Sequence, residues 1–226
     1  MIRLSRRSTL FALAVALAPG VALGAPLAPK GAAPSLPQEQ KLVFKIMRKG
    51  SPIGLYTIDI ATKGRLTTVD VTTNIKVTVL FLTAYQLSQK GREIWNGDQF
   101  VSYKGKTDDN GKKHVVSIAA GPKNTTIIAN GKLSIAPKGA IPASLWNAGF
   151  LDQSLLIDPA NGRQIPVKVV DMGKQSVVVQ GVKETARHYH IHGLKRDVWM
   201  VKGEPVRFQI IGSDNSTVVS TLQPSG

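Results

Sequence analysis

The sequence contains no cysteine among its 226 residues. Disulfide bonds, thiol catalysis and cysteine-ligated metal sites are therefore excluded, and the folded state depends on its hydrophobic core for stability. A chain of this length can bury such a core within a single domain.

Acidic residues are scarce. The chain has 14 Asp and Glu against 29 Lys and Arg, which gives a formal net charge of +15. Such a positive protein attracts anionic partners, for example lipid headgroups, acidic polysaccharide or acidic proteins. We expect no nucleic-acid partner, because no nucleic-acid-binding motif is recognisable. The alternative is that the charge serves solubility alone.

Motifs of common enzyme classes are also missing. There is no nucleophile elbow, no glycine-rich phosphate-binding loop and no HExxH zinc motif. Glu93 and Asp197 each lie close to a tryptophan, but no paired general acid and base can be assigned from the sequence. No apolar run reaches the ~20 residues of a transmembrane helix. These absences favour a non-enzymatic protein without a transmembrane segment.

The amino terminus predicts export. Residues 1–24 resemble a secretory signal peptide, with Arg3, Arg6 and Arg7, an apolar run at 10–17 and small residues before a cut after Gly24. The Arg6-Arg7 pair also resembles a twin-arginine signal, which would mean folding before export. Cleavage removes three positive charges from +15 and leaves +12. We predict a periplasmic or secreted protein.

The Pro- and Ala-rich residues 25–40 predict a flexible tether, and residues 41–226 a single β-barrel-like domain. The stretch 187–222 shows the clearest strand pattern, because Tyr189 and Ile191 alternate with histidines, and Val206, Phe208 and Ile210 with polar residues. Turn residues at 202–204 and 213–215 divide it into an antiparallel meander of three or four strands.

Similar strand patterns fill the remaining domain, and Asn110-Gly111 and Asn130-Gly131 are typical hairpin turns. Between Pro142 and Leu156 apolar residues recur every three to four positions, which predicts one short helix over an open end of the sheet. The predicted fold class is therefore all-β: a strongly curved antiparallel sheet or open barrel of about a dozen strands with one short helix.

Four patches carry a family resemblance. They are LVFKIMRKGSPIG at 42–54, Glu93-Ile94-Trp95, Trp146-Asn147 with 156–162, and Asp197-Val198-Trp199 with 206–208. Their order is similar to an exported proteobacterial family classed only as a domain of unknown function. Met200-Val201-Lys202 departs from that family's pattern. No catalytic residue is established for that family. The chain more distantly resembles the half-barrels of periplasmic lipoprotein and lipid carriers, which implies a similar fold.

Three histidines form the one obvious chemical cluster. His188, His190 and His192 alternate along one predicted strand and so share a face, about 6.6 to 6.8 Å apart. Two of them could bind Zn or Cu with a further ligand from His114 or Asp197. The alternative is an ordinary solvated face without metal.

Aromatic residues are few, and we expect several of them to line a ligand cavity. The candidates are Trp95, Phe100, Trp146, Phe150, Trp199 and Phe208. The alternative is that they fill an ordinary packed core.

The leading hypothesis is a non-enzymatic periplasmic binding module for a hydrophobic or anionic envelope ligand, such as a lipid, without a cofactor. The first alternative is a metal-binding protein or enzyme built on the histidine strand, with Zn or Cu as cofactor. The second is a structural partner of an envelope complex that docks through its basic face.

Overall fold

The computed structural model describes residues 38–79, 82–212 and 214–224. The predicted signal peptide and most of the predicted tether lie outside these residues. The first strand begins at Gln38, three residues before the predicted domain boundary. Among the described residues, no helix is long and apolar enough to cross a lipid bilayer.

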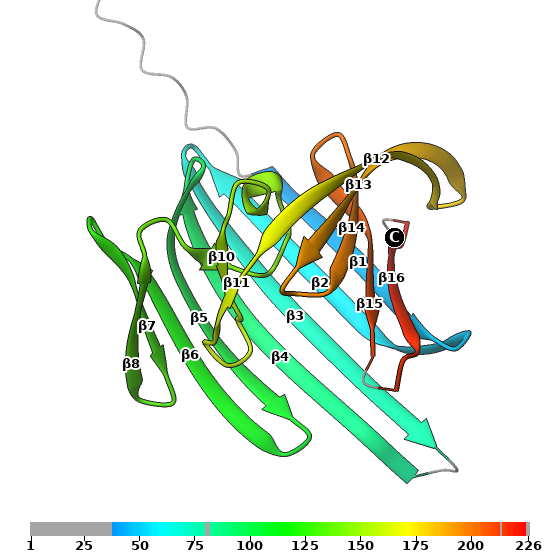
Figure 1. Cartoon of the computed structure of the whole chain (residues 1–226), viewed down its shortest axis with the longest axis horizontal. Coiled ribbons are helices and arrows are strands. Elements are labelled where there is room, and N and C mark those ends of the chain that lie inside the picture. The colour runs from blue at the N-terminus through cyan, green and yellow to red at the C-terminus, as the bar shows by residue number, and fades with distance from the viewer. Residues whose placement is uncertain (1–37, 80–81, 213, 225–226) are drawn as a thin grey trace, which may run out of the picture. The chain divides into compact units, whose positions relative to one another are not determined.

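Sixteen strands and one short 3-10 helix make up the described fold (Figure 1). Their bounds are β1 Gln38–Arg48, β2 Ser51–Lys63, β3 Leu66–Val79, β4 Leu82–Asn96, β5 Gln99–Asp109, β6 Lys112–Ala120, β7 Asn124–Ala129, β8 Lys132–Pro137, β9 Ile141–Pro142, η1 Ala148–Phe150, β10 Leu155–Ile157, β11 Gln164–Pro166, β12 Lys168–Val179, β13 Val182–His192, β14 Arg196–Val201, β15 Glu204–Ile211 and β16 Thr217–Leu222. The prediction of an all-β chain is confirmed.

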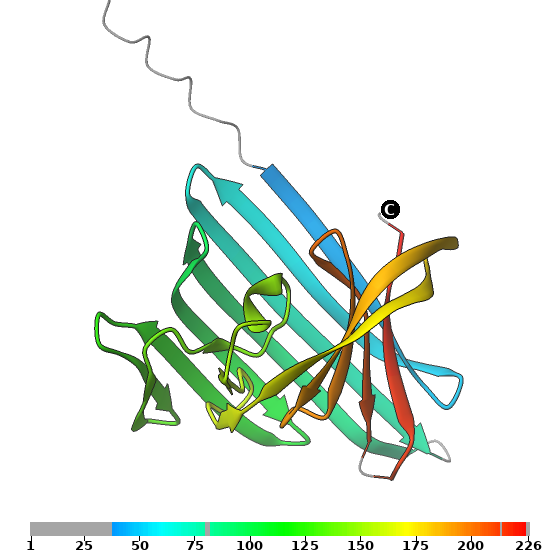
Figure 2. The ribbon, with the colours of Figure 1, turned by 45° about the horizontal axis from the view of Figure 1, so that its top comes forward.

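Thirteen strands form one antiparallel sheet in the order β12-β13-β14-β15-β16-β1-β2-β3-β4-β5-β6-β7-β8. The predicted antiparallel sheet is confirmed, but its predicted strong curvature is wrong, because the sheet is not strongly curled (Figures 1 and 2). It is also not closed, since β8 and β12 are the two ends of the strand order. The chain between β8 and β12 forms a separate three-stranded sheet, β11-β10-β9, instead of joining the two edges.

The predicted hairpin turns are confirmed. Asn110 and Gly111 both adopt positive φ, 53° and 89°, between β5 and β6, and Asn130 and Gly131 do the same between β7 and β8. Asn and Gly tolerate this left-handed backbone, which gives the twist that a two-residue hairpin needs. The predicted carboxy-terminal meander is also confirmed, as the four consecutive strands β13 to β16.

Residues 140–166, here called the covering segment, lie over one face of the large sheet (Figures 1 and 2). The predicted helix between Pro142 and Leu156 is wrong apart from the single turn η1. Pro142 instead pairs as a strand with Ile157, and Leu145 has a φ of +57°, which a helix cannot accommodate.

The sheet face beneath the covering segment is called the inner face, and the opposite one the outer face. Alternation places Phe44, Ile58 and Val69 inward, where each is 0 % exposed. Phe150, Leu156 and Ile157 of the covering segment belong to the same buried cluster. The core therefore lies between the large sheet and the covering segment.

Candidate functional site

The inner face is divided into a packed half and a hollow half. At one end of the long strands β3 and β4, Val69 and Trp95 are buried under the covering segment. At the other end, Ile75 and Leu87 line a cavity of about 820 Å³. This volume lies within the range of small-molecule sites in proteins.

The walls of the cavity are mostly aliphatic. The floor comes from β1 to β4 and β14 to β16, and the roof from the covering segment and the β13–β14 turn. Side chains that share this apolar character and line it are Ile46, Ile53, Val71, Ile75, Val77, Leu87, Ile165, Leu194, Phe208, Ile210 and Val218. Such a surface favours a ligand with substantial apolar area.

Five charged residues also line the cavity: Arg48, Arg163, Arg196, Asp158 and Asp214. Arg48 is neutralised, because its Nη2 lies 2.6 Å from Asp214 Oδ2. The Ser216 hydroxyl donates to Asp214, and this bond, with that of Lys49, holds the pKa of Asp214 well below its ordinary value. Asp214 is thus ionised and compensates its basic neighbours.

Side-chain hydrogen bonds hold the covering segment over the sheet, and three of them involve aromatic side chains. The hydroxyls of Tyr56 and Tyr103 donate to the carbonyls of Ser144 and Pro159, at 2.6 and 2.9 Å. The Trp146 indole donates to Glu93 Oε2 at 3.0 Å. Burial raises the pKa of both tyrosines, so they stay neutral donors.

Glu93 is fully buried on β4 between two indoles. Its Oε2 accepts hydrogen bonds from Trp95 and Trp146, whereas its Oε1 has no partner among the described residues. Burial raises the pKa of this carboxyl, although the bonds from Ser144 and both indoles act in the opposite direction. The carboxyl joins sheet and covering segment, which is a structural role.

The structure places one of the six predicted cavity aromatics, Phe208, among the cavity-lining residues. Trp95, Phe100 and Phe150 belong to the packed core, and Trp146 lies against Trp95 with ring centroids 5.6 Å apart. Trp199 is buried among β12 to β15, where its indole donates to Gln175 at 2.8 Å.

The three predicted metal ligands lie together on β13, at the other end of the sheet order from His114. His188 Nε2 and His190 Nδ1 lie 2.8 and 3.0 Å from the same oxygen, Asp197 Oδ1. His190 and His192 pack edge to face at 4.6 Å. Within the described ranges, no group of three potential ligands has the geometry of a metal site.

The His188 ring is stacked on Trp199 at 4.4 Å, and Arg207 covers the same indole at 4.7 Å. These residues are direct cross-strand neighbours on β13, β14 and β15. The row is a continuous polar and aromatic stack, and Nδ1 of His188 is buried within it without a described partner.

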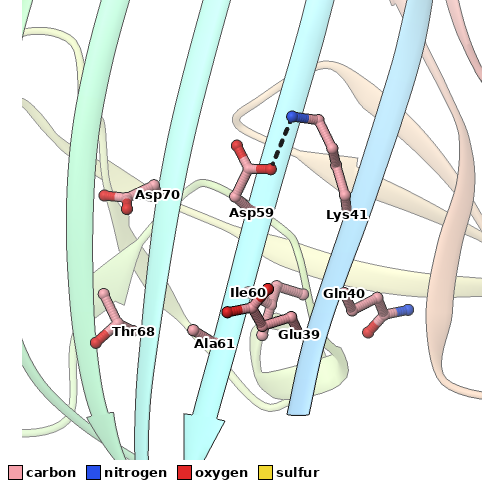
Figure 3. Close-up of a pocket in the computed structure, with 8 residues that line it drawn as sticks. All are labelled: Glu39, Gln40, Lys41, Asp59, Ile60, Ala61, Thr68 and Asp70. Carbon is pink, nitrogen blue, oxygen red and sulfur yellow. Dashed lines mark ion pairs between the residues drawn. The ribbon is translucent and has the colours of Figure 1, made fainter. Parts of the chain in front are cut away.

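A second, shallower pocket of about 390 Å³ opens on β1 to β3 and contains Glu39, Asp59 and Asp70 (Figure 3). Asp59 pairs with Lys41 at 3.1 Å, and Asp70 pairs with Arg92 at 2.7 Å. These exposed pairs account for two of the three carboxylates, and we assign the pocket no ligand.

Sequence reasoning missed Arg196, Tyr56 and Asp158 as cavity residues. A signal for Arg196 was present, because it stands two residues before Val198 and period-two alternation puts both on the inner face. Asp158 follows β10 in the covering segment, and its position depends on how that segment folds over the sheet.

Comparison with known proteins gives a family and no function. No curated protein was found to match the chain. A family defined as a domain of unknown function, DUF6134, matches residues 44–223, which contain almost all of the large sheet, the covering segment and the cavity. The chain belongs to the DUF6134 family.

Proposed function

We propose that this protein is a non-enzymatic binding module that holds a hydrophobic or amphipathic ligand in the cavity of its inner face. The observation that carries the proposal is a cavity of about 820 Å³ with aliphatic walls. Burial of apolar surface is favourable, so an open cavity of this size with apolar walls is suited to a ligand that covers those walls. The predicted export makes a lipid of the cell envelope the natural source.

Two features support binding without chemistry. The most deeply buried carboxyl, Glu93, is held by Trp95 and Trp146 and does not line the cavity. The hydroxyls of Tyr56 and Tyr103 are engaged with carbonyls of the covering segment. Glu93, Tyr56 and Tyr103 therefore serve to hold the covering segment over the sheet.

The proposal is tested by purifying the protein from its native envelope and analysing an organic extract by mass spectrometry. We expect an apolar compound to co-purify with the wild type and to be absent from Ile75→Trp, which fills the cavity. Leu55→Trp is the matched control, because Leu55 is 47 % exposed and does not line the cavity. An empty wild-type protein that also fails to bind the neutral apolar dye N-phenyl-1-naphthylamine would refute the proposal.

A second candidate is metal binding by the histidine strand. It is favoured by the shared contact of His188 and His190 with Asp197, a grouping of two imidazoles and one carboxylate. It predicts that elemental analysis finds stoichiometric Zn or Cu, and that His190→Ala with His192→Ala removes it. His114→Ala is the control on β6. A metal-free wild type after incubation with Zn or Cu would eliminate this candidate.

A third candidate is docking to an anionic envelope component through the outer face. Lys90 lies opposite Lys106, and Arg92 opposite Lys104, on neighbouring strands β4 and β5. All four are exposed. This candidate predicts salt-sensitive binding to anionic vesicles; equal binding to neutral vesicles would contradict it.

A further inference from the structure

Arg196 lies between apolar neighbours in a cross-strand row that continues from Val218 to Arg48 on β1. The row crosses the inner face from Ile191 on β13 through Arg196 to Ile210 and Val218, which are successive cross-strand partners. Cross-strand partners on one face have Cβ atoms about 5 Å apart, so Ile191 and Ile210 flank the arginine closely. A cation is thus placed in the apolar wall of the cavity.

Arg196 is half-buried, and the innermost nitrogen of its guanidinium lacks a protein partner. Its Nε is buried without a hydrogen-bond acceptor in the described part of the chain. Two nearby groups, Tyr56 and Asp158, act on its charge, and burial lowers its pKa. The Tyr56 hydroxyl, however, donates to Ser144, and the Asp158 oxygens accept from the Ala160 amide and the Asn161 side chain.

An arginine retains its charge even when burial opposes it. A buried charge without a hydrogen-bonded counterion is destabilising, whereas an aliphatic side chain at the same position would pack without that cost. The presence of an arginine in this apolar wall therefore points to a ligand that provides the missing hydrogen-bond acceptor.

The charges that line the cavity favour a ligand with one negative charge. Arg48 pairs with Asp214, which also pairs with Lys49 outside the cavity lining. Arg163 and Arg196 then exceed the remaining acid, Asp158, by one positive charge. A second negative charge on the ligand would be repelled by Asp158 without a cation to balance it.

We propose that the ligand is a monoanionic amphiphile whose anionic group binds Arg196 and whose apolar chain lies along Ile46, Ile75 and Leu87. This inference rests on the proposed function. A fatty-acid carboxylate and a phosphodiester headgroup share the required chemistry, since both present oxygens that accept charge-assisted hydrogen bonds from a guanidinium. Ile46, Ile75 and Leu87 continue the apolar wall across β1, β3 and β4.

The test uses the protein after delipidation and follows displacement of N-phenyl-1-naphthylamine. Palmitate is compared with hexadecanol, which has the same chain without a charge. Lysophosphatidylglycerol is compared with lysophosphatidylcholine, which carries an additional positive charge. We expect palmitate, lysophosphatidylglycerol or both to displace the dye at least about tenfold more effectively than the matched compound.

Arg196→Met removes the charge and keeps most of the side-chain length. We expect it to bind hexadecanol like the wild type and to lose the tenfold preference for the anion. Arg65→Met is the matched control, because Arg65 is exposed, lies outside the cavity and contacts Asn96. Thermal unfolding of the ligand-free proteins should show Arg196→Met at least as stable as the wild type, since an uncompensated charge has been removed.

The outcomes separate the two proposals. Dye and hexadecanol binding with no preference for either anion would overturn the inference and leave the proposed function standing. A preference that survives in Arg196→Met would also overturn it. Failure of the wild type to bind dye, alcohol or anion would refute both. Marked destabilisation of ligand-free Arg196→Met would show that protein groups satisfy Arg196 and would count against a ligand acceptor.

Discussion

Trp146 and Glu93 are joined by a 3.0 Å hydrogen bond although 53 residues separate them in the sequence. Trp146 belongs to the covering segment and Glu93 to β4, so the bond links the covering segment to the large sheet. A second indole, Trp95, donates to the same oxygen at 2.8 Å.

We expect Trp146→Phe to destabilise the fold by about 1 to 3 kcal/mol, because it removes a donor from a buried carboxyl. Urea unfolding measures the change. In the Glu93→Gln background the same substitution should cost less, since no buried carboxyl then loses its partner. An equal cost in both backgrounds would show that Trp146 contributes by packing alone.

The raised pKa of Glu93 predicts a definite pH dependence. Its ordinary value is 4.5, and the folded state binds the proton more tightly than the unfolded state. Stability contributed by the protonated form is therefore present below pH 4.5 and is lost as the pH rises towards the folded-state pKa. Each unit of upward shift corresponds to about 1.4 kcal/mol.

Urea unfolding between pH 4 and pH 8 should show this loss in the wild type. Glu93→Gln should lack it, because the amide does not titrate. Asp98→Asn, at an exposed turn residue, is the control and should leave the profile unchanged. Parallel profiles for the wild type and Glu93→Gln would contradict the prediction.

Tyr103 lies flat across two glycines, Gly91 on β4 and Gly105 on β5. A Cβ added to either glycine would overlap the Tyr103 ring. We expect Gly105→Ala to destabilise the protein by about 1 to 3 kcal/mol through overpacking. Denaturant unfolding checks the value. In a Tyr103→Leu background most of the penalty should disappear, and an undiminished penalty there would locate its cause elsewhere.

Lys90 and Lys106 are directly opposed on the outer face, and like charges in such positions are destabilising. Lys106→Glu should therefore raise stability by about 0.2 to 1 kcal/mol at low salt, with a smaller gain in 1 M salt. Thermal unfolding at both salt concentrations measures this. Lys123→Glu makes the same change of charge on an exposed residue outside the strands and should not reproduce the gain.

Local chemistry predicted the strands and hairpins well. Asn110-Gly111 and the alternation through Tyr189 and Ile191 depend on neighbours in sequence, and the structure confirms both. Closure of the sheet depends on whether β8 meets β12, which no local pattern determines. The sequence of the covering segment predicts a helix because Trp146 and Phe150 recur at helical spacing, although they pack on different neighbours, Trp95 and Tyr189.

The candidate site was predicted less well for a related reason. Aromatic residues offer the largest area for burial, and Trp95, Phe100 and Phe150 therefore fill the core instead of bordering a void. The cavity is lined largely by aliphatic residues, whose sequence pattern is the same whether they face a neighbour or empty space. Arg196 was the informative exception, because it is a charged residue at a position that alternation places on the inner face.

The long strands β3 and β4 run through both halves of the inner face, with Val69 and Glu93 in the solid part and Ile75 and Leu87 beside the void. The packed core and the cavity thus lie at opposite ends of the same two strands. A substitution at the Ile75 end therefore alters the cavity wall and leaves the packed end around Glu93 unchanged.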